Sequence, residues 1–157
     1  MSALFSEHDH AAMQHALALA ALAATLGEVP VGAVVYHALT GQIIGAGFNR
    51  RALDGDPTAH AEMLAITAAA KRVGDWRLTG YRLAVTLEPC CMCAGAIVLA
   101  RLDDLVFAAA DPKAGACGSL HRLTQDARLN HRIVPRAGLM AEQSAELLRT
   151  FFRSRRT

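Results

Sequence analysis

The stretch Glu88-Pro89-Cys90-Cys91-Met92-Cys93-Ala94-Gly95-Ala96-Ile97 contains three of the four cysteines in the chain. It predicts a helix that begins near Pro89, because a proline in the first helical turn loses no hydrogen bond through its missing N–H. Cys90 and Cys93 are three positions apart, so both sulfur atoms lie on one face of that helix. This spacing suits two thiolates that bind one zinc ion, and the positive end of the helix dipole favours the thiolate form. Two sulfurs make only half of a zinc site, so the other ligands lie elsewhere.

A second motif, Thr58-Ala59-His60-Ala61-Glu62, supplies the residue types that are missing. Thr58 is the expected N-cap of a helix, so His60 lies in the first turn, and both helix starts can open at the same sheet edge. One His and two Cys leave a fourth position for water, and zinc lowers the pKa of that water to about 7. Glu62 can then accept a proton and return protons to a substrate. Alone, His60 would more often be a core residue, and only the combination of both motifs favours zinc.

The rest of the sequence predicts an α/β fold. Helices are expected over residues 6–27, 58–73, 89–101 and 141–153, with a short one after Ser119; strands are expected over 31–37, 43–49, 81–86 and 105–109, with a brief one near Ile133. The first two strands form a hairpin, and Gly45 and Gly47 indicate a bulge or a close backbone approach. Helices alternate with the later strands, which predicts a sheet that is largely parallel there and is sandwiched between helices. Residues 50–57 and 111–119 are expected as loops.

Composition indicates one compact domain over residues 1–157, since 53% of the residues are hydrophobic. The Ala/Leu-rich run over residues 16–26 is far too short to span a membrane. Acidic residues stand where a signal peptide would have a positive region, so the protein is expected to be intracellular. In intracellular proteins, clustered cysteines more often bind metal than form disulfides. Cys91 and Cys117 are interpreted as small core residues.

Positive charge is concentrated in the last quarter of the chain. Residues 1–120 carry 8 basic and 11 acidic side chains, whereas residues 121–157 carry 8 and 3, and every base there is arginine. Arginine is the side chain best suited to phosphate, so a nucleic-acid partner is one interpretation and a solvated helix face is the other. The candidate phosphate contacts are Arg149, Arg153, Arg155 and Arg156.

His-Ala-Glu followed by Pro-Cys-x-x-Cys resembles the signature of the zinc-dependent nucleoside and nucleobase deaminases. Nearly the whole chain is similar to the bacterial tRNA adenosine deaminases of that cytidine deaminase-like superfamily. The similar segments are 27–33 (GEVPVGA), 49–50 (NR), 56–62 (DPTAHAE), 85–90 (VTLEPC), 111–116 (DPKAGA), 118–120 (GSL), 130–132 (NHR) and 151–153 (FFR). The zinc motif alone is also found in cytidine, cytosine and guanine deaminases, and the later segments favour the tRNA enzymes.

The resemblance implies a three-layer α/β/α cytidine deaminase-like fold with a five-stranded mixed sheet. It also implies one zinc ion per subunit, held by His60, Cys90 and Cys93, a homodimer and a cytoplasmic location. The implied reaction converts the wobble adenosine of a tRNA anticodon loop to inosine, with zinc hydroxide as the nucleophile at C6 and Glu62 as the proton shuttle. An unpaired base of that loop can be splayed into a pocket at low unstacking cost.

The resemblance also implies a substrate pocket. Asn49 would hydrogen-bond the purine and Asp111 would lie near the ribose, while further lining would come from Glu28, Val29, Pro30, Ala61, Leu87 and Glu88. Asn49 as a turn former and Asp111 as a loop cap remain open. Two other functions also remain open: a free nucleobase deaminase acting on guanine or cytosine, and a zinc-stabilised RNA-binding module without activity.

Overall fold

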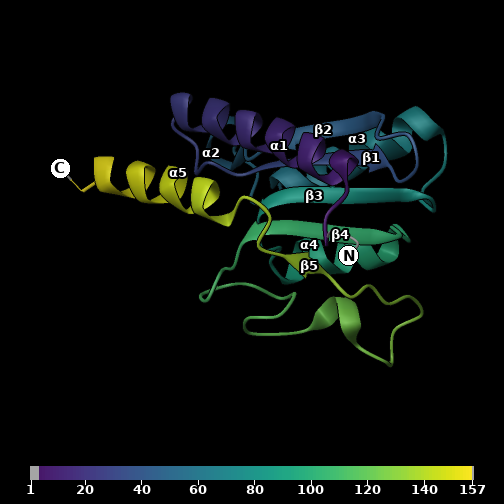
Figure 1. The fold of residues 1–157 in the computed structure, drawn as a ribbon. Helices are drawn as coiled ribbons and strands as arrows, with labels where there is room; N and C mark the ends of the chain where they lie inside the picture. Colours follow the sequence, from purple (N-terminus) through teal and green to yellow (C-terminus); the bar gives the residue numbers. More distant parts are fainter. Residues whose placement is uncertain (1–3, 157) are drawn as a thin grey trace.

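Five strands form one mixed sheet with helices on both faces in the computed structural model, which describes residues 4–156 (Figure 1). The strands are β1 (Gly32–His37), β2 (Ile43–Phe48), β3 (Tyr81–Leu87), β4 (Asp104–Ala109) and β5 (Arg136–Ala137), in the order β2-β1-β3-β4-β5. Strand β1 is antiparallel to β2 and β3, whereas β3, β4 and β5 are parallel. The α/β class, the hairpin and the parallel arrangement after it are therefore confirmed.

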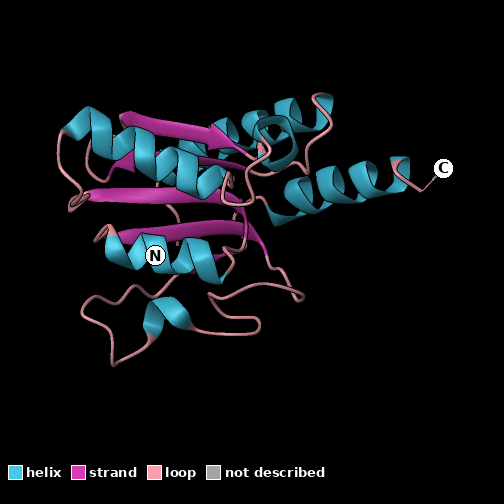
Figure 2. Cartoon of the chain, turned by 180° about the vertical axis from the view of Figure 1, so that it is seen from behind, coloured by secondary structure: helices cyan, strands magenta, loops and turns pink. Residues whose placement is uncertain are grey.

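The helices of the described residues are α1 (Glu7–Thr25), α2 (Arg51–Asp54), α3 (Ala61–Val73), α4 (Cys91–Leu99), the 3-10 helix η1 (Leu123–Gln125) and α5 (Ala141–Ser154). The four longest of them lie in two layers. Helices α1 and α5 pack on one face of the sheet, while α3 and α4 cover the other (Figure 1, Figure 2). Within residues 4–156, no helix is both long enough and apolar enough to cross a membrane.

Side chains that alternate along the strands fill the two interfaces between the layers. The face toward α1 carries Val34, Tyr36, Ala84 and Val106, and the face toward α3 and α4 carries Val35, Leu83, Val85 and Phe107. Since successive residues of a strand point to opposite faces, each central strand contributes to both cores. This burial on both faces explains why these strands are apolar throughout.

Two strand glycines allow α3 to approach β2 closely. A Cβ atom at Gly45 would overlap the Ala65 carbonyl oxygen, and one at Gly47 would lie 2.8 Å from the Ala61 carbonyl oxygen. The register of the β1–β2 pair also shifts between Val35 and Tyr36. The sequence predicted a bulge or a close backbone approach here, and the structure has both.

Two predictions about irregular segments were wrong. Residues 51–54 of the predicted 50–57 loop form α2, which ends at Gly55 in the left-handed conformation (φ 58°). The last strand, β5, lies at residues 136–137 rather than near Ile133, because the Ile133 N–H donates to the Thr124 carbonyl oxygen instead of to the sheet. Neither segment has the apolar periodicity on which the predictions relied.

Candidate functional site

The three candidate metal ligands lie at the starts of two neighbouring helices. His60 is the N-cap of α3 and Cys90 is the N-cap of α4, both with extended backbone dihedrals, and Cys93 lies one turn into α4. The predicted helix starts differ from the observed ones. Thr58 is not the cap, since its N–H and hydroxyl both donate to Asp56 Oδ1 at 2.8 Å, and Pro89 precedes the helix rather than starting it.

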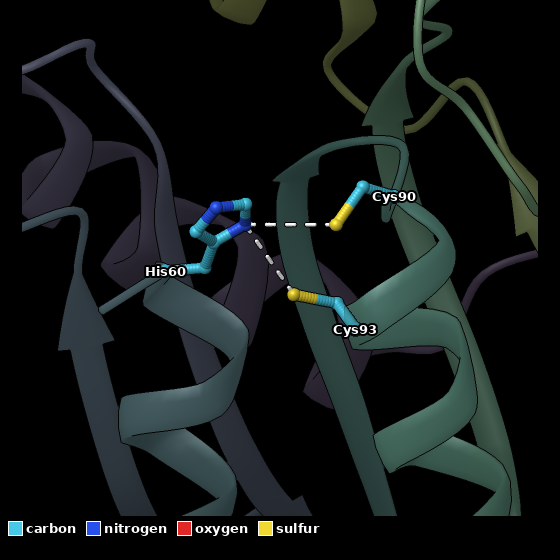
Figure 3. Close-up of side chains that lie close together, drawn as sticks. All are labelled: His60, Cys90 and Cys93. Carbon is cyan, nitrogen blue, oxygen red and sulfur yellow. Dashed lines mark hydrogen bonds between the residues drawn. The ribbon is translucent and has the colours of Figure 1, made fainter. Parts of the chain in front are cut away.

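The spacing of these side chains matches tetrahedral zinc. His60 Nδ1 lies 3.6 Å from Cys90 Sγ and 3.6 Å from Cys93 Sγ, and Figure 3 shows the three side chains converging from the two helix starts. With Zn–S bonds of about 2.3 Å and Zn–N bonds of about 2.0 Å, nitrogen and sulfur ligands of a tetrahedral site are about 3.6 Å apart. All three ligand atoms lie within 4.8 Å of one another. The donor set and the geometry therefore both fit a zinc ion.

The pKa values of the two candidate thiol ligands are shifted in opposite directions. A hydrogen bond from Cys93, followed by one from His60, lowers the pKa of Cys90 to about 3. The same hydrogen bond with Cys90, together with burial, raises the pKa of Cys93. Cys90 is therefore a thiolate at neutral pH. Since metal binding displaces protons from thiol ligands, a divalent cation would also deprotonate Cys93.

Glu62 is a buried carboxylic acid beside this group. It lies in the first turn of α3, and its exposed fraction is 4%. Burial raises the pKa of Glu62 to about 7, because desolvation disfavours the charged carboxylate. A carboxyl group with such a pKa can both accept and donate a proton near neutral pH.

His60, Cys90 and Glu62 line one large pocket of about 1020 Å³. Its walls come from four parts of the chain: the segment around β1 and β2, the starts of α3 and α4, the segment after β4, and the last two turns of α5 with the residues after them. The other lining residues are Val29, Val31, Asn49, Arg51, Ala61, Leu87, Glu88, Ala110, Asp111, Pro112, Lys113, Ala114, Leu148, Arg149, Phe152, Arg153, Arg155 and Arg156.

Most residues predicted for the substrate pocket lie on its walls. Asn49 is buried, its side-chain N–H donates to the Val29 carbonyl oxygen at 3.3 Å, and its side-chain oxygen accepts from the Arg51 N–H at 3.2 Å. The structure places Glu28 and Pro30 behind the wall rather than on it. The Glu28 carboxylate accepts from the N–H of Leu53 at 2.6 Å and so holds α2 in place.

The segment after β4 is held by the two acidic residues predicted for the pocket. Asp111 Oδ1 accepts from the N–H groups of Lys113 (3.0 Å) and Ala114 (3.2 Å), as a loop cap does. The buried Glu88 carboxylate accepts from backbone N–H groups of the same segment. Burial acts to raise the pKa of Glu88, but hydrogen bonds from Ser119 and its neighbours outweigh it and leave the pKa lowered.

The four arginines near the C-terminus differ in what they contact. Arg149 forms ion pairs with Glu142 and Glu146 at 2.6 Å each. Arg155 donates to the Gly27 carbonyl oxygen at 2.9 Å. Arg153 and Arg156 are exposed, and their guanidinium groups make no hydrogen bond or ion pair with the described residues 4–156.

Helix α5 has two apolar stripes where one was predicted. Leu148 and Phe152 line the large pocket, while Leu147 and Phe151 line a groove beside α1. Each pair is four positions apart and so shares a face of the helix. Adjacent apolar pairs in a strongly amphipathic helix are the signal that could have revealed the second stripe.

Sequence reasoning missed two basic residues at the pocket and misjudged one cysteine. Arg51 and Lys113 both line the pocket, and their positions, two residues after Asn49 and Asp111, could have identified them. The interpretation of Cys91 as a core residue was wrong: its side chain is exposed, because the first residue of α4 faces away from the sheet. Cys117 is buried, as predicted.

Comparison with known proteins shows which sequences and structures this chain is similar to. The sequence model described as "Cytidine and deoxycytidylate deaminase zinc-binding region" matches residues 6–109. The chain is 46% identical to a tRNA-specific adenosine deaminase of Haemophilus influenzae over 151 residues, which cover 96% of this chain and 87% of the relative. It is 45% identical to a tRNA-specific adenosine deaminase of Bacillus subtilis over 148 residues, with coverage of 94% and 91%.

Solved structures are similar as well. One comes from a study of A-to-I editing by tRNA:A34 deaminases at the wobble position of transfer RNA, with a TM-score of 0.83 and 41% identity over 88% of this chain and 99% of that one. A guanine deaminase of Nitrosomonas europaea has a TM-score of 0.77 and 26% identity, with coverage of 96% and 86%. Fold and site thus define a deaminase of the class that carries the cytidine and deoxycytidylate deaminase zinc-binding region. Within that class, the chain belongs to the family of tRNA-specific adenosine deaminases.

Proposed function

We propose that this protein hydrolytically deaminates the wobble adenosine of a tRNA anticodon loop, converting it to inosine and releasing ammonia. One observation carries the proposal: the buried acid Glu62 lies beside the His60, Cys90 and Cys93 group in a large pocket edged with arginines. The identity of 45–46% to relatives named tRNA-specific adenosine deaminase supports the choice of substrate.

The chemistry follows from the residues in the pocket. His60, Cys90 and Cys93 would hold one zinc ion per subunit, which supplies a nucleophile by lowering the pKa of a water molecule to about 7. Glu62 takes up the proton of that water and delivers protons to the adenine ring nitrogen and the departing amine. Its pKa of about 7 suits both transfers.

The target base enters the pocket from an unpaired loop. Val29, Ala61 and Leu87 supply its apolar walls, and the side chain of Asn49, which also lines the pocket, hydrogen-bonds the polar edge of the purine. Asp111, at the opposite wall, faces the sugar of the flipped nucleotide. A loop base is unpaired already, so extruding it requires less free energy than extruding a base from a duplex.

The neighbouring phosphates meet the arginines of α5 and the residues after it. Arg153 and Arg156 make the main contacts, because their guanidinium groups are exposed and no residue within the described range 4–156 engages them. Arg149 and Arg155 also line the pocket but already have protein partners. Arginine suits this task because its planar fork matches a phosphate group.

The working unit is a cytoplasmic homodimer of one-domain subunits. Helix α4 exposes Cys91 and Leu99 on the side away from the sheet, and the exposed fraction of Leu99 is 68%. Large apolar side chains that stay exposed on a helix are consistent with a protein interface.

An assay on two substrate classes tests the proposal. Zinc-loaded protein is incubated with an anticodon stem-loop RNA that contains a wobble adenosine and, separately, with adenine, guanine and cytosine. Inosine in the RNA is the expected product. The second candidate is a guanine deaminase, which the similarity to the Nitrosomonas europaea enzyme favours. Turnover of guanine without any inosine in the RNA would establish that candidate instead.

A further inference from the structure

The carboxylate of Glu88 fastens one wall of the pocket to the start of the metal-binding helix. We infer that Glu88 is a positioning residue, which holds the 111–119 segment and with it Asp111 in the geometry that binds substrate. The inference rests on the proposed function in one respect: the effect of Glu88 on substrate binding is measured through the deamination reaction. The positioning role belongs to the side chain of Glu88. The pocket-lining role that the resemblance implies for Glu88 requires only its backbone.

Four hydrogen bonds converge on the two oxygen atoms of this carboxylate. Glu88 Oε1 accepts from the Asp111 N–H at 3.0 Å and from the Ser119 hydroxyl at 2.5 Å. Glu88 Oε2 accepts from the Cys117 N–H at 3.1 Å and from the Ser119 N–H at 2.9 Å. The bonds reach both ends of the 111–119 segment, so this side chain fixes the segment as a whole.

Glu88 itself is held firmly. It follows β3 directly, its N–H donates to the Ala109 carbonyl oxygen at 2.8 Å, and its exposed fraction is 3%. Pro89, the next residue, accepts from the Ala116 N–H at 2.9 Å. Cys90 follows one position later, so the anchor of the segment is continuous in the chain with a candidate metal ligand.

The segment is shaped to receive the carboxylate. Gly115 is buried, and a Cβ atom there would overlap the carboxyl group of Glu88. The Gly115 N–H also donates to the Asp111 carbonyl oxygen at 2.9 Å, which closes a turn around the acidic side chain. Glycine is therefore required at position 115 for lack of space rather than for an unusual φ angle.

Loss of this anchor would act on substrate binding. Three backbone N–H groups, of which that of Cys117 is buried, would lose a charged acceptor. Hydrogen bonds to charged groups are among the stronger ones in proteins. Asp111 would then lack a fixed position, so substrate would have to order the segment when it binds. The hydrogen bonds to the Glu88 carboxylate come from Asp111, Cys117 and Ser119 and not from the metal-site residues, so the chemical step on bound substrate would continue.

Two substitutions test the contact from opposite sides. Glu88→Gln keeps the length of the side chain but turns an amide NH₂ toward two of the donors, and Gly115→Ala places a methyl group where the carboxylate lies. For deamination of the stem-loop, each should raise KM by about tenfold or more while kcat changes by less than about twofold. The double variant should be little worse than Glu88→Gln alone, because both changes break one contact.

Three further measurements make the result decisive. Glu7→Gln, the same chemical change at an exposed position of α1, should leave KM unchanged. Zinc content should stay at the wild-type value in all variants. Hydrogen exchange in the free protein should show loss of protection at the amides of Asp111, Cys117 and Ser119 in Glu88→Gln. This last readout needs no substrate, so it separates failure of the inference from failure of the proposed function.

The inference is overturned if KM stays at the wild-type value or if zinc is lost from Glu88→Gln, since the residue would then serve the metal centre instead. Unchanged protection of the three amides would also overturn it. If Glu88→Gln fails to fold, Ser119→Ala removes only the hydroxyl donor and should still raise KM, by about two- to fivefold. No change in KM for that variant would count against the inference as well.

Discussion

At the scale of single residues, two buried acids of the pocket have different environments. Burial raises the pKa of Glu62 to about 7, because its hydrogen bonds with the backbone and with Cys93 offset the desolvation only in part. Glu88 is equally buried, but its four hydrogen bonds stabilise the charged form. The first acid can therefore exchange protons at neutral pH, whereas the second stays charged and serves structure.

Replacement of Glu62 by Ala should abolish deamination without loss of the metal. The Glu62 side chain transfers protons, which accelerates such a reaction by roughly 10²–10⁴-fold. Glu62 is not one of the three candidate metal ligands. Inosine formation, zinc content and RNA binding should be measured together on the variant and on wild type. Survival of activity would show that the proposed proton shuttle is wrong.

The three clustered cysteines should respond differently to replacement by Ala. Cys90→Ala removes a sulfur atom that lies 3.6 Å from His60 Nδ1, so zinc content should fall strongly. Cys91→Ala removes an exposed thiol at the next position, and zinc content should stay at the wild-type value. Metal analysis of the two purified variants provides a matched comparison. Equal zinc loss in both would contradict the assignment of ligands.

At the scale of elements, the start of α1 is tied to three strands. Ser6 and Asp9 form the predicted capping box. Asp9 also accepts from the Tyr36 hydroxyl at 2.6 Å and forms ion pairs with Arg82 at 3.0 Å and Arg136 at 2.7 Å. One buried carboxylate therefore joins α1 to β1, β3 and β5.

Replacement of Asp9 by Asn should destabilise the fold in a pH-dependent way. Burial acts to raise the pKa of Asp9, but hydrogen bonds from Arg136 and Tyr36 outweigh it and hold the pKa well below its usual range. A lowered pKa in the folded state means that the charge stabilises the fold at any pH above the unfolded value of about 3.9. The free energy of unfolding should fall by about 3 kcal/mol at pH 7.

The difference between Asp9→Asn and wild type should shrink as the pH falls below about 4, since protonation removes the same charge from wild type. Urea denaturation at neutral and acidic pH measures this difference in the free energy of unfolding. The control is Asp103→Asn, the same change at an exposed position. A pH-independent difference would show that the ion pairs do not act through the Asp9 charge.

The elements that could be predicted are those with a local pattern. Apolar strands, capping residues and helix-ending glycines identified α1, α3, α5 and the four long strands. The Asp9 network could not be predicted, because it joins residues 73 and 127 positions apart without any periodic signal. The residue types of the candidate ligands could be predicted from the spacing of the two motifs. The place of His60 and Cys90 at the N-caps could not, because it depends on the loop conformation before each helix.

At the scale of the whole molecule, α5 extends the pocket beyond the sheet. Figure 1 shows this helix continuing past the ends of the strands toward the C-terminus. Its residues Leu148, Phe152 and Arg153 line the same pocket as the candidate ligands His60 and Cys90. The basic C-terminal segment noted in the sequence is therefore brought to the pocket by the fold.

Arg153→Gln and Arg156→Gln should each weaken binding of the stem-loop and reduce its dependence on salt. Each phosphate contact contributes about 0.7–0.9 to the slope of log K against log salt concentration, so the slope should fall by about that amount per variant. Arg149→Gln should change the slope less, because Glu142 and Glu146 already neutralise that side chain. Titrations at several salt concentrations provide the test, and equal slopes in all variants would exclude the phosphate role.

The most direct test of the central claim is the product formed in the RNA. The zinc-loaded protein is incubated with an anticodon stem-loop in water enriched in heavy oxygen, and the nucleosides are then analysed by mass spectrometry. We predict one inosine, at the wobble position, that carries one heavy oxygen atom, together with one equivalent of ammonia. Unchanged adenosine in the RNA, with guanine consumed under the same conditions, would contradict the account.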